Sequence, residues 1–378
     1  MLVTYRFRLY PTRTQERLMA ETLQTCRRLY NSLLADRRES GVGFYQAQHS
    51  LIIRKSESRY LRAVHSQVLQ DVNIRLDKSL EAFFAGLVRF PRFKRNGRYN
   101  SFTYPQRTGF KIIGNRLKLS KIGSVKARLH REVIGTPKRC TVIRDVDQWF
   151  ACIMVEQEEP QRPANVSCKP SVGVDLGVIN LVALSDGTLI DNQRFLGHSA
   201  ERINALQRRI SRKERGSNNR EKAKSSLAKA WRKVRRQRDD FAHKLSDKLT
   251  KENQVIVFED LKIPNMVKNH NLASAIMDST WGKLRWLTAY KAERRGGRVI
   301  LVEPRGTSQK CSGCGEMVPK GLSTRTHRCL RCGLVMDRDV NAARNILKLG
   351  LERARAEEQP LLIRRRISKF APVRQEVH

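Results

Sequence analysis

The stretch Thr307–Leu347 reads TSQKCSGCGEMVPKGLSTRTHRCLRCGLVMDRDVNAARNIL, and it largely decides how the second half of the chain folds. Two Cys-x-x-Cys pairs lie within it, Cys311 with Cys314 and Cys329 with Cys332, separated by 14 residues. Each pair can offer two thiolates to one ion, and two pairs complete a closed tetrahedral site that suits Zn²⁺. We therefore predict one zinc ion, held by these four cysteines in a small ribbon.

Two alternatives to this zinc site stay open at the level of sequence. The same four thiols could form two disulfides, although nothing else in the chain suggests secretion. His327 could also replace one of the cysteines as a ligand. A site with four protein ligands has no position for substrate, so we expect the zinc to be structural.

The charge of the chain predicts a polyanionic partner. Lys and Arg number 75 and Asp and Glu 36 in 378 residues, which gives a net charge of +39. The excess is spread along the chain rather than confined to one tail, and nucleic acid is the obvious partner for such a surface. The length predicts two or three domains.

The sequence also predicts a reducing, cytoplasmic setting without membrane contact. No apolar run approaches the ~18–20 residues that cross a bilayer. Residues 1–9 alternate in polarity and carry arginines, unlike a secretion signal. The other cysteines are scattered and show no disulfide framework; they are Cys26, Cys140, Cys152 and Cys168.

Three acidic residues stand out by position in the second half. Asp175 interrupts the buried-strand pattern SVGVDLGV, Glu259 ends the strand pattern QVIVFED, and Asp339 opens the last helical pattern. Strands followed by helices, with acids at these points, match a ribonuclease-H-like α/β layout in which the acids meet at one sheet edge. Carboxylates so close together repel one another unless divalent metal neutralises them. Two Mg²⁺ ions held in this way would break phosphodiesters.

The choice of acids is ambiguous from spacing alone. Asp337 could serve instead of Asp339, and Asp260 instead of Glu259. Asp339 could also be a helix N-cap and Asp175 a turn residue.

The first half of the chain predicts a small β-barrel with helices inserted into it. Residues 1–9 alternate as a half-buried strand, and short alternating runs separated by glycines follow between Ser101 and Glu156. Between these regions, Thr12 and Gln15 can form a capping box before a helix that runs to about Arg38. A second long helical pattern covers residues 64–87.

Two basic segments are candidates for contact with nucleic acid. Basic and aromatic residues interleave between Arg89 and Tyr104, which suits either stacking on bases or a strand edge whose rings join the core. Residues 201–250 carry 17 Lys and Arg against six acids and predict a helical hairpin with one apolar stripe, including Trp231, and one basic face. Residues 281–295 predict another amphipathic helix, with Trp286 on its apolar side.

Several motifs together give the chain a resemblance to the TnpB family of transposon-encoded, RNA-guided nucleases, which are similar to type V CRISPR effectors. The resemblance covers nearly the whole chain and is most specific in the second half. The motifs are FRLYPTRTQERLM, RRLYNSLL, FPRFK, GVDLGVINLVALSDG, VIVFEDL, IMDSTWGKLRWLTAYKAERRGG, EPRGTSQKCSGCG, HRCLRCG and DRDVNAARNIL.

The resemblance implies a fold and a set of catalytic residues. It implies a RuvC-like nuclease domain with a zinc ribbon inserted before its last helix, and an N-terminal barrel, the wedge, with an inserted helical recognition region. The implied catalytic acids are Asp175, Glu259 and Asp339, the last being the acid of Asp-x-Asn, which favours it over Asp337. The guide would be RNA from the transposon end and the target double-stranded DNA beside a short motif, with base pairing supplying sequence choice.

The expected organisation divides the chain into six parts. They are the wedge barrel over residues 1–10 and 89–158, the recognition helices over 11–88, a linker over 159–170, the nuclease domain over 171–306 and 334–352, the zinc ribbon over 307–333, and a basic, possibly disordered tail over 353–378.

The expected function is RNA-guided cleavage of double-stranded DNA by two-metal hydrolysis, by a chain acting as a monomer. Two other functions use the same features: a nuclease-inactive RNA-guided DNA-binding regulator, and a transposase acting in strand transfer. Arg325, in the ribbon and close in sequence to Asp339, is a candidate contact to the scissile phosphate.

Overall fold

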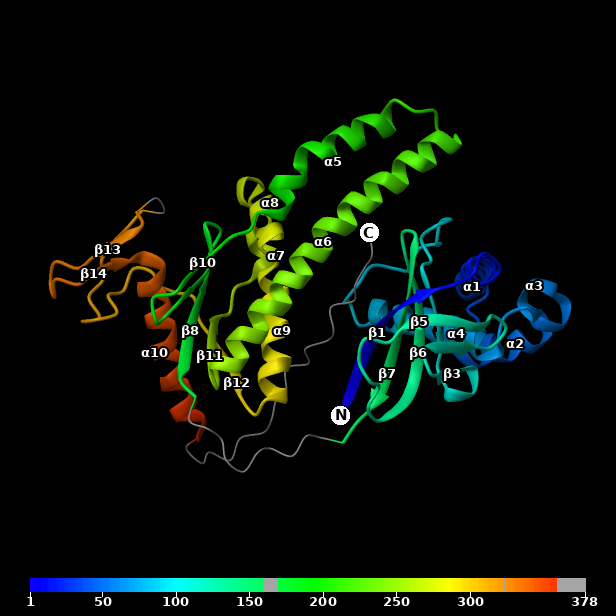
Figure 1. The fold of residues 1–378 in the computed structure, drawn as a ribbon, viewed down its shortest axis with the longest axis horizontal. Coiled ribbons are helices and arrows are strands. Elements are labelled where there is room, and N and C mark those ends of the chain that lie inside the picture. The colour runs from blue at the N-terminus through cyan, green and yellow to red at the C-terminus, as the bar shows by residue number, and fades with distance from the viewer. Residues whose placement is uncertain (159–168, 322–323, 359–378) are drawn as a thin grey trace. The chain divides into compact units, whose positions relative to one another are not determined.

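The computed structural model describes residues 1–158, 169–321 and 324–358 of the chain. The chain divides into two units, residues 1–160 and 161–378 (Figure 1). Most of the predicted linker, residues 159–168, and the last twenty residues of the predicted tail lie outside the described residues.

The first unit is built on a seven-stranded antiparallel sheet. β1 lies in its middle, between β7 and β5, and pairs with β7 from Leu2 opposite Glu156 to Leu9 opposite Trp149. Among the described strands no ladder joins the two outer ones, so the closed barrel stays a prediction. The order is β2-β6-β7-β1-β5-β4-β3, with bounds β1 Leu2–Tyr10, β2 Ser101–Tyr104, β3 Phe110–Ile113, β4 Arg116–Leu119, β5 Gly123–Arg128, β6 Thr136–Asp145 and β7 Gln148–Glu156.

Four α-helices and one 3-10 turn are inserted into this sheet between its strands. The capping box is confirmed, because the Gln15 amide donates to the Thr12 hydroxyl and the Thr12 amide donates back to the Gln15 side chain. The apolar faces of α1 and α4 join the buried sheet residues in one core. The bounds are α1 Arg13–Glu39, α2 Phe44–Glu57, α3 Arg59–Arg62, α4 Ser66–Phe84 and η1 Arg107–Gly109.

The basic and aromatic segment, residues 89–104, divides between the two predicted alternatives: its last rings join the core and its first rings are exposed. Phe102 and Tyr104 are each 1% exposed and belong to the core, whereas Phe90 and Phe93 are exposed. The change comes where the chain enters β2, whose ladder with β6 turns these later side chains into the core.

The second unit contains a mixed five-stranded sheet whose order is β10-β9-β8-β11-β12. β8, β11 and β12 are parallel, and β9 and β10 add to β8 as antiparallel strands. Phe258 lies beside Val174 in this register, which places Glu259 next to Asp175 at the carboxyl ends of neighbouring strands. The bounds are β8 Ser171–Leu176, β9 Asn180–Leu184, β10 Leu189–Asp191, β11 Val255–Glu259 and β12 Arg298–Val302.

Helices cover both faces of this sheet (Figure 1). α6 and α9 pack on the face that carries Val172 and Val174, and α10 packs on the opposite face against Val257 and Ile300. The bounds are α5 Phe195–Ser211, α6 Asn218–Glu252, α7 Ile263–Met266, α8 His270–Ser279, α9 Trp281–Arg294 and α10 Arg338–Glu358; a small hairpin of β13 Thr326–Arg328 and β14 Val335–Asp337 precedes α10.

α10 lies unusually close to the sheet because glycines stand at two contact points. A Cβ on Gly173 of β8 would lie 2.0 Å from the Ala343 carbonyl oxygen, and a Cβ on Gly350 of α10 would lie 2.4 Å from Val257. Only residues without a Cβ fit at such approaches. The two glycines therefore set how closely α10 lies over β8 and β11.

Some predicted boundaries and faces were wrong. α10 extends to residue 358, beyond the predicted end of the nuclease domain at 352, so the first six residues of the predicted tail are helical. The extension is anchored by Ala354, which is buried against the sheet, and by Arg353, which donates to the Leu301 carbonyl at 2.8 Å. Trp231 and Trp286, which were expected on apolar stripes, are 39% and 44% exposed.

Across the described residues, no helix combines the length and the apolarity needed to span a membrane.

Candidate functional site

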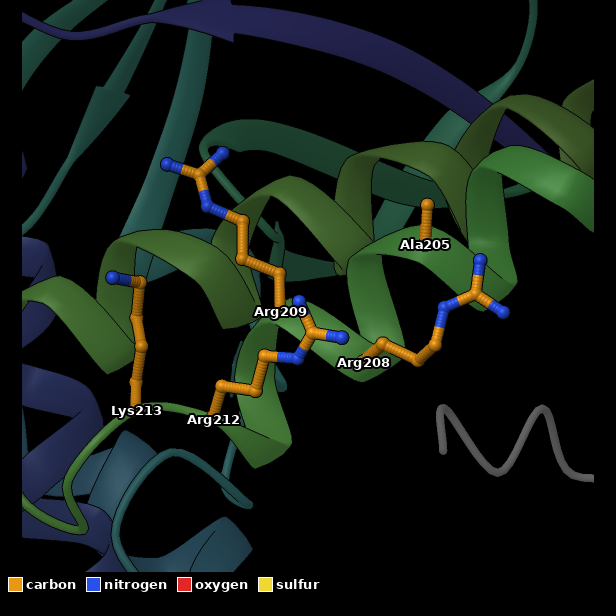
Figure 2. Close-up of a pocket in the computed structure, with 5 residues that line it drawn as sticks. All are labelled: Ala205, Arg208, Arg209, Arg212 and Lys213. Carbon is orange, nitrogen blue, oxygen red and sulfur yellow. The ribbon is translucent and has the colours of Figure 1, made fainter.

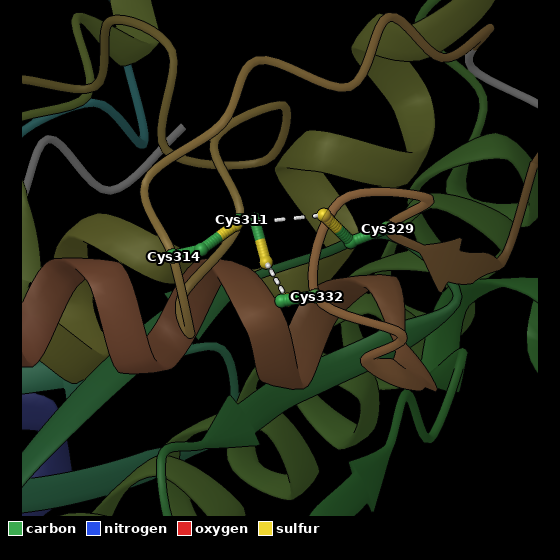
Figure 3. A group of neighbouring side chains, drawn as sticks. All are labelled: Cys311, Cys314, Cys329 and Cys332. Carbon is green, nitrogen blue, oxygen red and sulfur yellow. Dashed lines mark hydrogen bonds between the residues drawn. The ribbon is translucent and has the colours of Figure 1, made fainter.

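The four cysteines of the ribbon form a compact cluster (Figure 3). Their sulfur atoms all lie within 4.8 Å of one another, with Sγ–Sγ distances of 3.7 Å from Cys311 to Cys332 and 3.6 Å from Cys314 to Cys329. Zn–S bonds of about 2.3 Å in a tetrahedron separate the sulfurs by about 3.8 Å. The cluster therefore fits a zinc ion.

The same distances decide between the alternatives for these thiols. A disulfide requires an S–S distance of about 2.05 Å, so the two-disulfide alternative is wrong, and all four cysteines are free. His327 is buried beside Lys320, whose ammonium contacts its Nδ1, and it is not among the four clustered ligands.

The three predicted acids come from three separate elements that meet at one end of the sheet. Asp175 lies in β8, Glu259 ends β11, and Asp339 lies in the first turn of α10. Asp175 shares its face of β8 with Gly173, against which α10 packs, and Asp339 precedes Ala343 by one helical turn. The close approach at Gly173 thus brings Asp339 to the same end of the sheet as Asp175.

The electrostatics of Asp175 show that these carboxylates are neighbours. Burial raises the pKa of Asp175 well above its usual range, and the charges of Glu259 and Asp339 raise it further. Burial also raises the pKa of Glu259 and, together with the nearby Asp337, that of Asp339. A cation bound among these groups would relieve both the burial cost and the repulsion.

The three carboxylates are spaced more widely than the cysteine sulfurs. Among the described residues, the cysteines are the one set of three or more His, Cys, Asp or Glu side chains whose ligand atoms all lie within 4.8 Å of one another. Two catalytic ions lie about 3.5–4 Å apart, so a donor set for a pair of ions extends over more space than one for a single zinc.

Local contacts separate each candidate acid from its sequence neighbour. Glu259 is 7% exposed and accepts a hydrogen bond of 2.5 Å from the Thr307 hydroxyl. Asp260 is instead exposed and paired with Arg285 at 3.1 Å. Asp337 caps α10, since its Oδ1 accepts from the amide of Asp339 at 2.8 Å and that of Val340 at 3.1 Å. These contacts favour Glu259 and Asp339 as the functional acids.

Arg325 lies next to Asp339, one of the candidate acids. Its Nη1 is 3.6 Å from Asp339 Oδ2, and its side chain is 47% exposed. Its backbone carbonyl accepts from the Arg338 amide at 2.7 Å, which ties this part of the ribbon to the start of α10.

Sequence reasoning missed three residues that connect the ribbon to the acids. Thr307 holds Glu259, and Asn345 donates to the Thr307 carbonyl at 2.8 Å. Asn341 accepts from the Ser312 amide at 2.9 Å and donates to the Lys310 carbonyl at 2.8 Å, which docks the first cysteine pair on α10. Asn341 and Asn345 stand four residues apart on one face of α10, and this spacing was the available signal.

A strongly basic face, the α5 face, lies at the C-terminal end of α5 (Figure 2). Arg208 and Arg209 lie in the last turn of α5, Arg212 and Lys213 directly follow it, and all four surround a hollow of about 510 Å³ that Ala205 also lines. This hollow lies within the segment for which the sequence predicted a basic face. Four cations gathered without an acid among the lining residues suit phosphate groups.

Comparison with known protein families gives three matches along the chain. Residues 152–270 match a family described as "Probable transposase", residues 281–346 match "Cas12f1-like, TNB domain", and residues 1–40 match "Helix-turn-helix domain".

Individual relatives match over most of their length. An Escherichia coli (strain K12) protein named "Putative RNA-guided DNA endonuclease InsQ" is 33% identical over 92% of this chain and 92% of its own. A Streptomyces pristinaespiralis protein named "Putative RNA-guided DNA endonuclease" is 34% identical over 92% of this chain and 89% of its own.

A solved structure shares the fold at low sequence identity. A chain in a cryo-EM structure of a Cas12f1–sgRNA–target DNA complex superimposes with a TM-score of 0.55 and 14% identity, covering 92% of this chain and 98% of that chain.

Proposed function

Because this chain belongs to the TnpB family, we propose that it is an RNA-guided DNA endonuclease that cuts double-stranded DNA beside a short motif. The observation that carries the proposal is the meeting of Asp175, Glu259 and Asp339, whose pKa values are all raised. The two relatives described above, matched over 92% and 89% of their own length, are named as putative RNA-guided DNA endonucleases, which supports the activity.

The proposed architecture is that of a nuclease with a separate recognition half. The sheet order β10-β9-β8-β11-β12, with antiparallel strands on one side of β8 and parallel ones on the other, supports a RuvC-like, ribonuclease-H-like second unit. The four-cysteine ribbon precedes its last helix. In the first unit, the β-strands would form the wedge and α1 to α4 the recognition region.

The proposed metal site consists of the three acids, which offer the hard oxygen donors that Mg²⁺ prefers. Two bound Mg²⁺ ions would supply an activated water and stabilise the leaving oxygen in phosphodiester hydrolysis. Thr307 keeps one oxygen of Glu259 fixed by its hydrogen bond, and Asp337 holds the first turn of α10. The protein thus orients its acids before DNA arrives.

The central test of this function is removal of one acid. Asp175→Ala should abolish Mg²⁺-dependent cleavage by the complex of the protein with its RNA, while RNA and DNA binding stay within about twofold. Asp260→Ala is the matched control, since that acid is exposed and paired with Arg285. Cleavage that survives in Asp175→Ala would overturn the site assignment.

The same assay separates the other two functions. If the wild-type protein binds target DNA with its RNA but cuts nothing in Mg²⁺, it acts as a DNA-binding regulator. If it joins DNA ends and produces strand-transfer products, it acts as a transposase.

Arg325 is proposed to contact the scissile phosphate. Its guanidinium lies beside Asp339 and is half exposed, so it can turn toward an incoming anion. Arg325→Ala should lower the cleavage rate by about tenfold or more at saturating DNA. Arg331→Ala, an exposed ribbon arginine paired with Glu316 at 2.8 Å, is the control. Normal turnover in Arg325→Ala would remove this role.

A further inference from the structure

A hollow in the first unit combines an exposed tyrosine with several arginines. It lies between α1, α3 and the loop of residues 97–100, has a volume of about 350 Å³, and is lined by Leu23, Arg28 and Tyr60, among others. Tyr60 is 53% exposed, whereas Leu23 is buried and forms part of the wall. A large ring is therefore presented to solvent at the edge of a concave surface.

A second hollow adjoins the first one at residues that line both. It has a volume of about 320 Å³, and it shares Thr25, Arg28 and Tyr60 with the first. Arg28 and Tyr60 thus line both hollows, so one bound group can extend from the first hollow over the tyrosine ring into the second.

The charge of the first hollow favours an anionic occupant. Arg17, Arg28 and Arg144 line it against a single acid, Glu21. Glu21 pairs with Arg17 at 4.0 Å, and both of these side chains are exposed. Two of the three arginines therefore have no acidic partner among the lining residues.

Arginines also lie over the tyrosine ring itself. The guanidinium carbon of Arg59 is 4.9 Å from the Tyr60 ring centroid, and that of Arg28 is 5.9 Å away. An exposed ring surrounded by cations is how proteins bind unpaired nucleotides, because the base stacks on the ring while cations contact the phosphates.

We propose that these two hollows form a nucleotide subsite in which Tyr60 stacks on one unpaired base and Arg28, with Arg17 and Arg144, contacts the neighbouring phosphates. This inference rests on the proposed function, which supplies an RNA guide and an opened DNA strand. Stacking does not distinguish RNA from DNA, so either strand can provide the nucleotide.

The first experiment measures binding to short single strands. The full-length protein is titrated with a 12-nucleotide RNA and with the corresponding DNA, each carrying 2-aminopurine, whose fluorescence falls on stacking. Tyr60→Ala should weaken binding of at least one strand by about 5- to 150-fold. Tyr60→Phe, which keeps the ring, should stay within about twofold of the wild type.

A matched control and a salt titration sharpen this result. Tyr10→Ala removes another exposed tyrosine of the same unit that does not line the hollows, and it should leave binding unchanged. Arg28→Ala should lower the slope of log affinity against log salt by about 0.7. Equal affinity of Tyr60→Ala and wild type for both strands would overturn the proposal.

A crosslinking experiment tests the subsite without any variant. Strands containing 4-thiouridine or 4-thiothymidine are irradiated with the wild-type protein, and the attached residues are mapped by mass spectrometry. Attachment at Tyr60 or within residues 23–28 is expected. A map that avoids these residues for both strands would contradict the proposal, even if a variant were unstable.

Failure of the subsite proposal can be distinguished from failure of the proposed function. Wild-type protein that cuts DNA while its Tyr60→Ala variant binds strands normally would refute the subsite alone. Wild-type protein that binds strands through Tyr60 but never cuts in Mg²⁺ would refute the nuclease and leave the subsite standing.

Discussion

Asp175 is held in a buried strand at a cost in stability, because a carboxylate there is both desolvated and repelled by Glu259 and Asp339. Such an arrangement is expected where function, rather than folding, selects the residue. The pairing of Asp260 with Arg285 shows the contrast, since that acid is exposed and compensated.

The first prediction concerns the stability of the metal-free protein. Because folding raises the pKa of Asp175, the native state loses stability as the pH rises from the pKa of the unfolded chain, about 3.9, and the full cost is present above the raised pKa. Asp175→Asn mimics the protonated form, so it should raise the melting temperature at pH 7 by a few degrees. The advantage should shrink as the pH falls toward about 4, where the folded and the unfolded wild type both carry this proton.

Thermal unfolding in chelator, monitored by circular dichroism from pH 7 to pH 4, measures this effect. Asp260→Asn should change little, since exposed ion pairs contribute at most about 1 kcal/mol. A less stable Asp175→Asn at pH 7 would contradict the account of this carboxylate.

The second prediction concerns Thr307, which donates to Glu259. Thr307→Val keeps the shape of the side chain and removes the hydroxyl, so Glu259 loses its fixed orientation. Loss of a group that orients a metal ligand typically lowers metal affinity by about 10–100-fold. The affinity for Mn²⁺, measured by electron paramagnetic resonance, should therefore fall by that amount. Thr326→Val, an exposed ribbon residue, is the control; unchanged Mn²⁺ affinity in Thr307→Val would remove this orienting role.

At the scale of elements, the position of α10 depends on Gly173. A Cβ there would meet the Ala343 backbone at 2.0 Å, so Gly173→Ala must push the helix away from β8. We expect a loss of about 1–3 kcal/mol in the free energy of unfolding and a large loss of cleavage, because Asp339 moves with the helix. Denaturant unfolding and the cleavage assay measure the two effects.

Gly197→Ala is the matched control for this substitution. Gly197 lies in α5, where an added Cβ would meet only Arg194 at an ordinary 3.7 Å, and alanine is the better helix former. A Gly173→Ala protein with wild-type stability and cleavage would show that α10 does not depend on this close approach.

The ribbon gives the next prediction at this scale. Metal analysis should find about one zinc per chain, and replacing Cys311 and Cys314 together by serine should remove it. Since Asn341 and Asn345 dock the ribbon on α10, loss of the zinc should also reduce cleavage. Cys152→Ser, outside the cluster, should retain the metal; full zinc content in the double variant would contradict the cluster.

Most elements could be predicted from the sequence because their signals are local. The hairpin of β6 and β7, the strand that carries Asp175 and the hairpin of α5 and α6 follow from alternation and from turn residues. α2 and α3 were missed, and the end of α10 was misplaced, because tertiary contacts such as those of Ala354 decide these elements. The contact of Thr307 with Glu259 depends on tertiary packing in the same way and could not be read from spacing.

At the scale of the whole molecule, the charge of +39 predicts electrostatic binding of nucleic acid. Binding should weaken steeply with salt, and reversing Arg208 and Arg212 of the α5 face to glutamate should lower the slope of log affinity against log salt by about 2. Filter binding with nonspecific duplex DNA at several salt concentrations measures this slope. Lys118→Glu, on β4, is the comparison variant. An unchanged slope in the α5 variant would exclude the α5 face as a contact surface for nucleic acid.

The metal chemistry of the proposed function could be predicted from the sequence because it needs few residue types. Four cysteines and three acids sufficed to suggest zinc and divalent metal, and the family resemblance supplied the guide RNA and target DNA. Spacing alone left Glu259 and Asp260, and Asp339 and Asp337, equivalent, and the family resemblance favoured Glu259 and Asp339. The three-dimensional contacts of Thr307, Arg285 and the α10 amides distinguish them.

The most direct test of the central claim locates the divalent metal itself. Crystals of the protein, alone or with its RNA and DNA, are equilibrated with Mn²⁺, and anomalous scattering is recorded at the manganese edge. We predict density between the carboxylates of Asp175, Glu259 and Asp339, which disappears in Asp175→Ala. Manganese bound elsewhere, with nothing between these three side chains, would contradict the claim that they form the catalytic metal site.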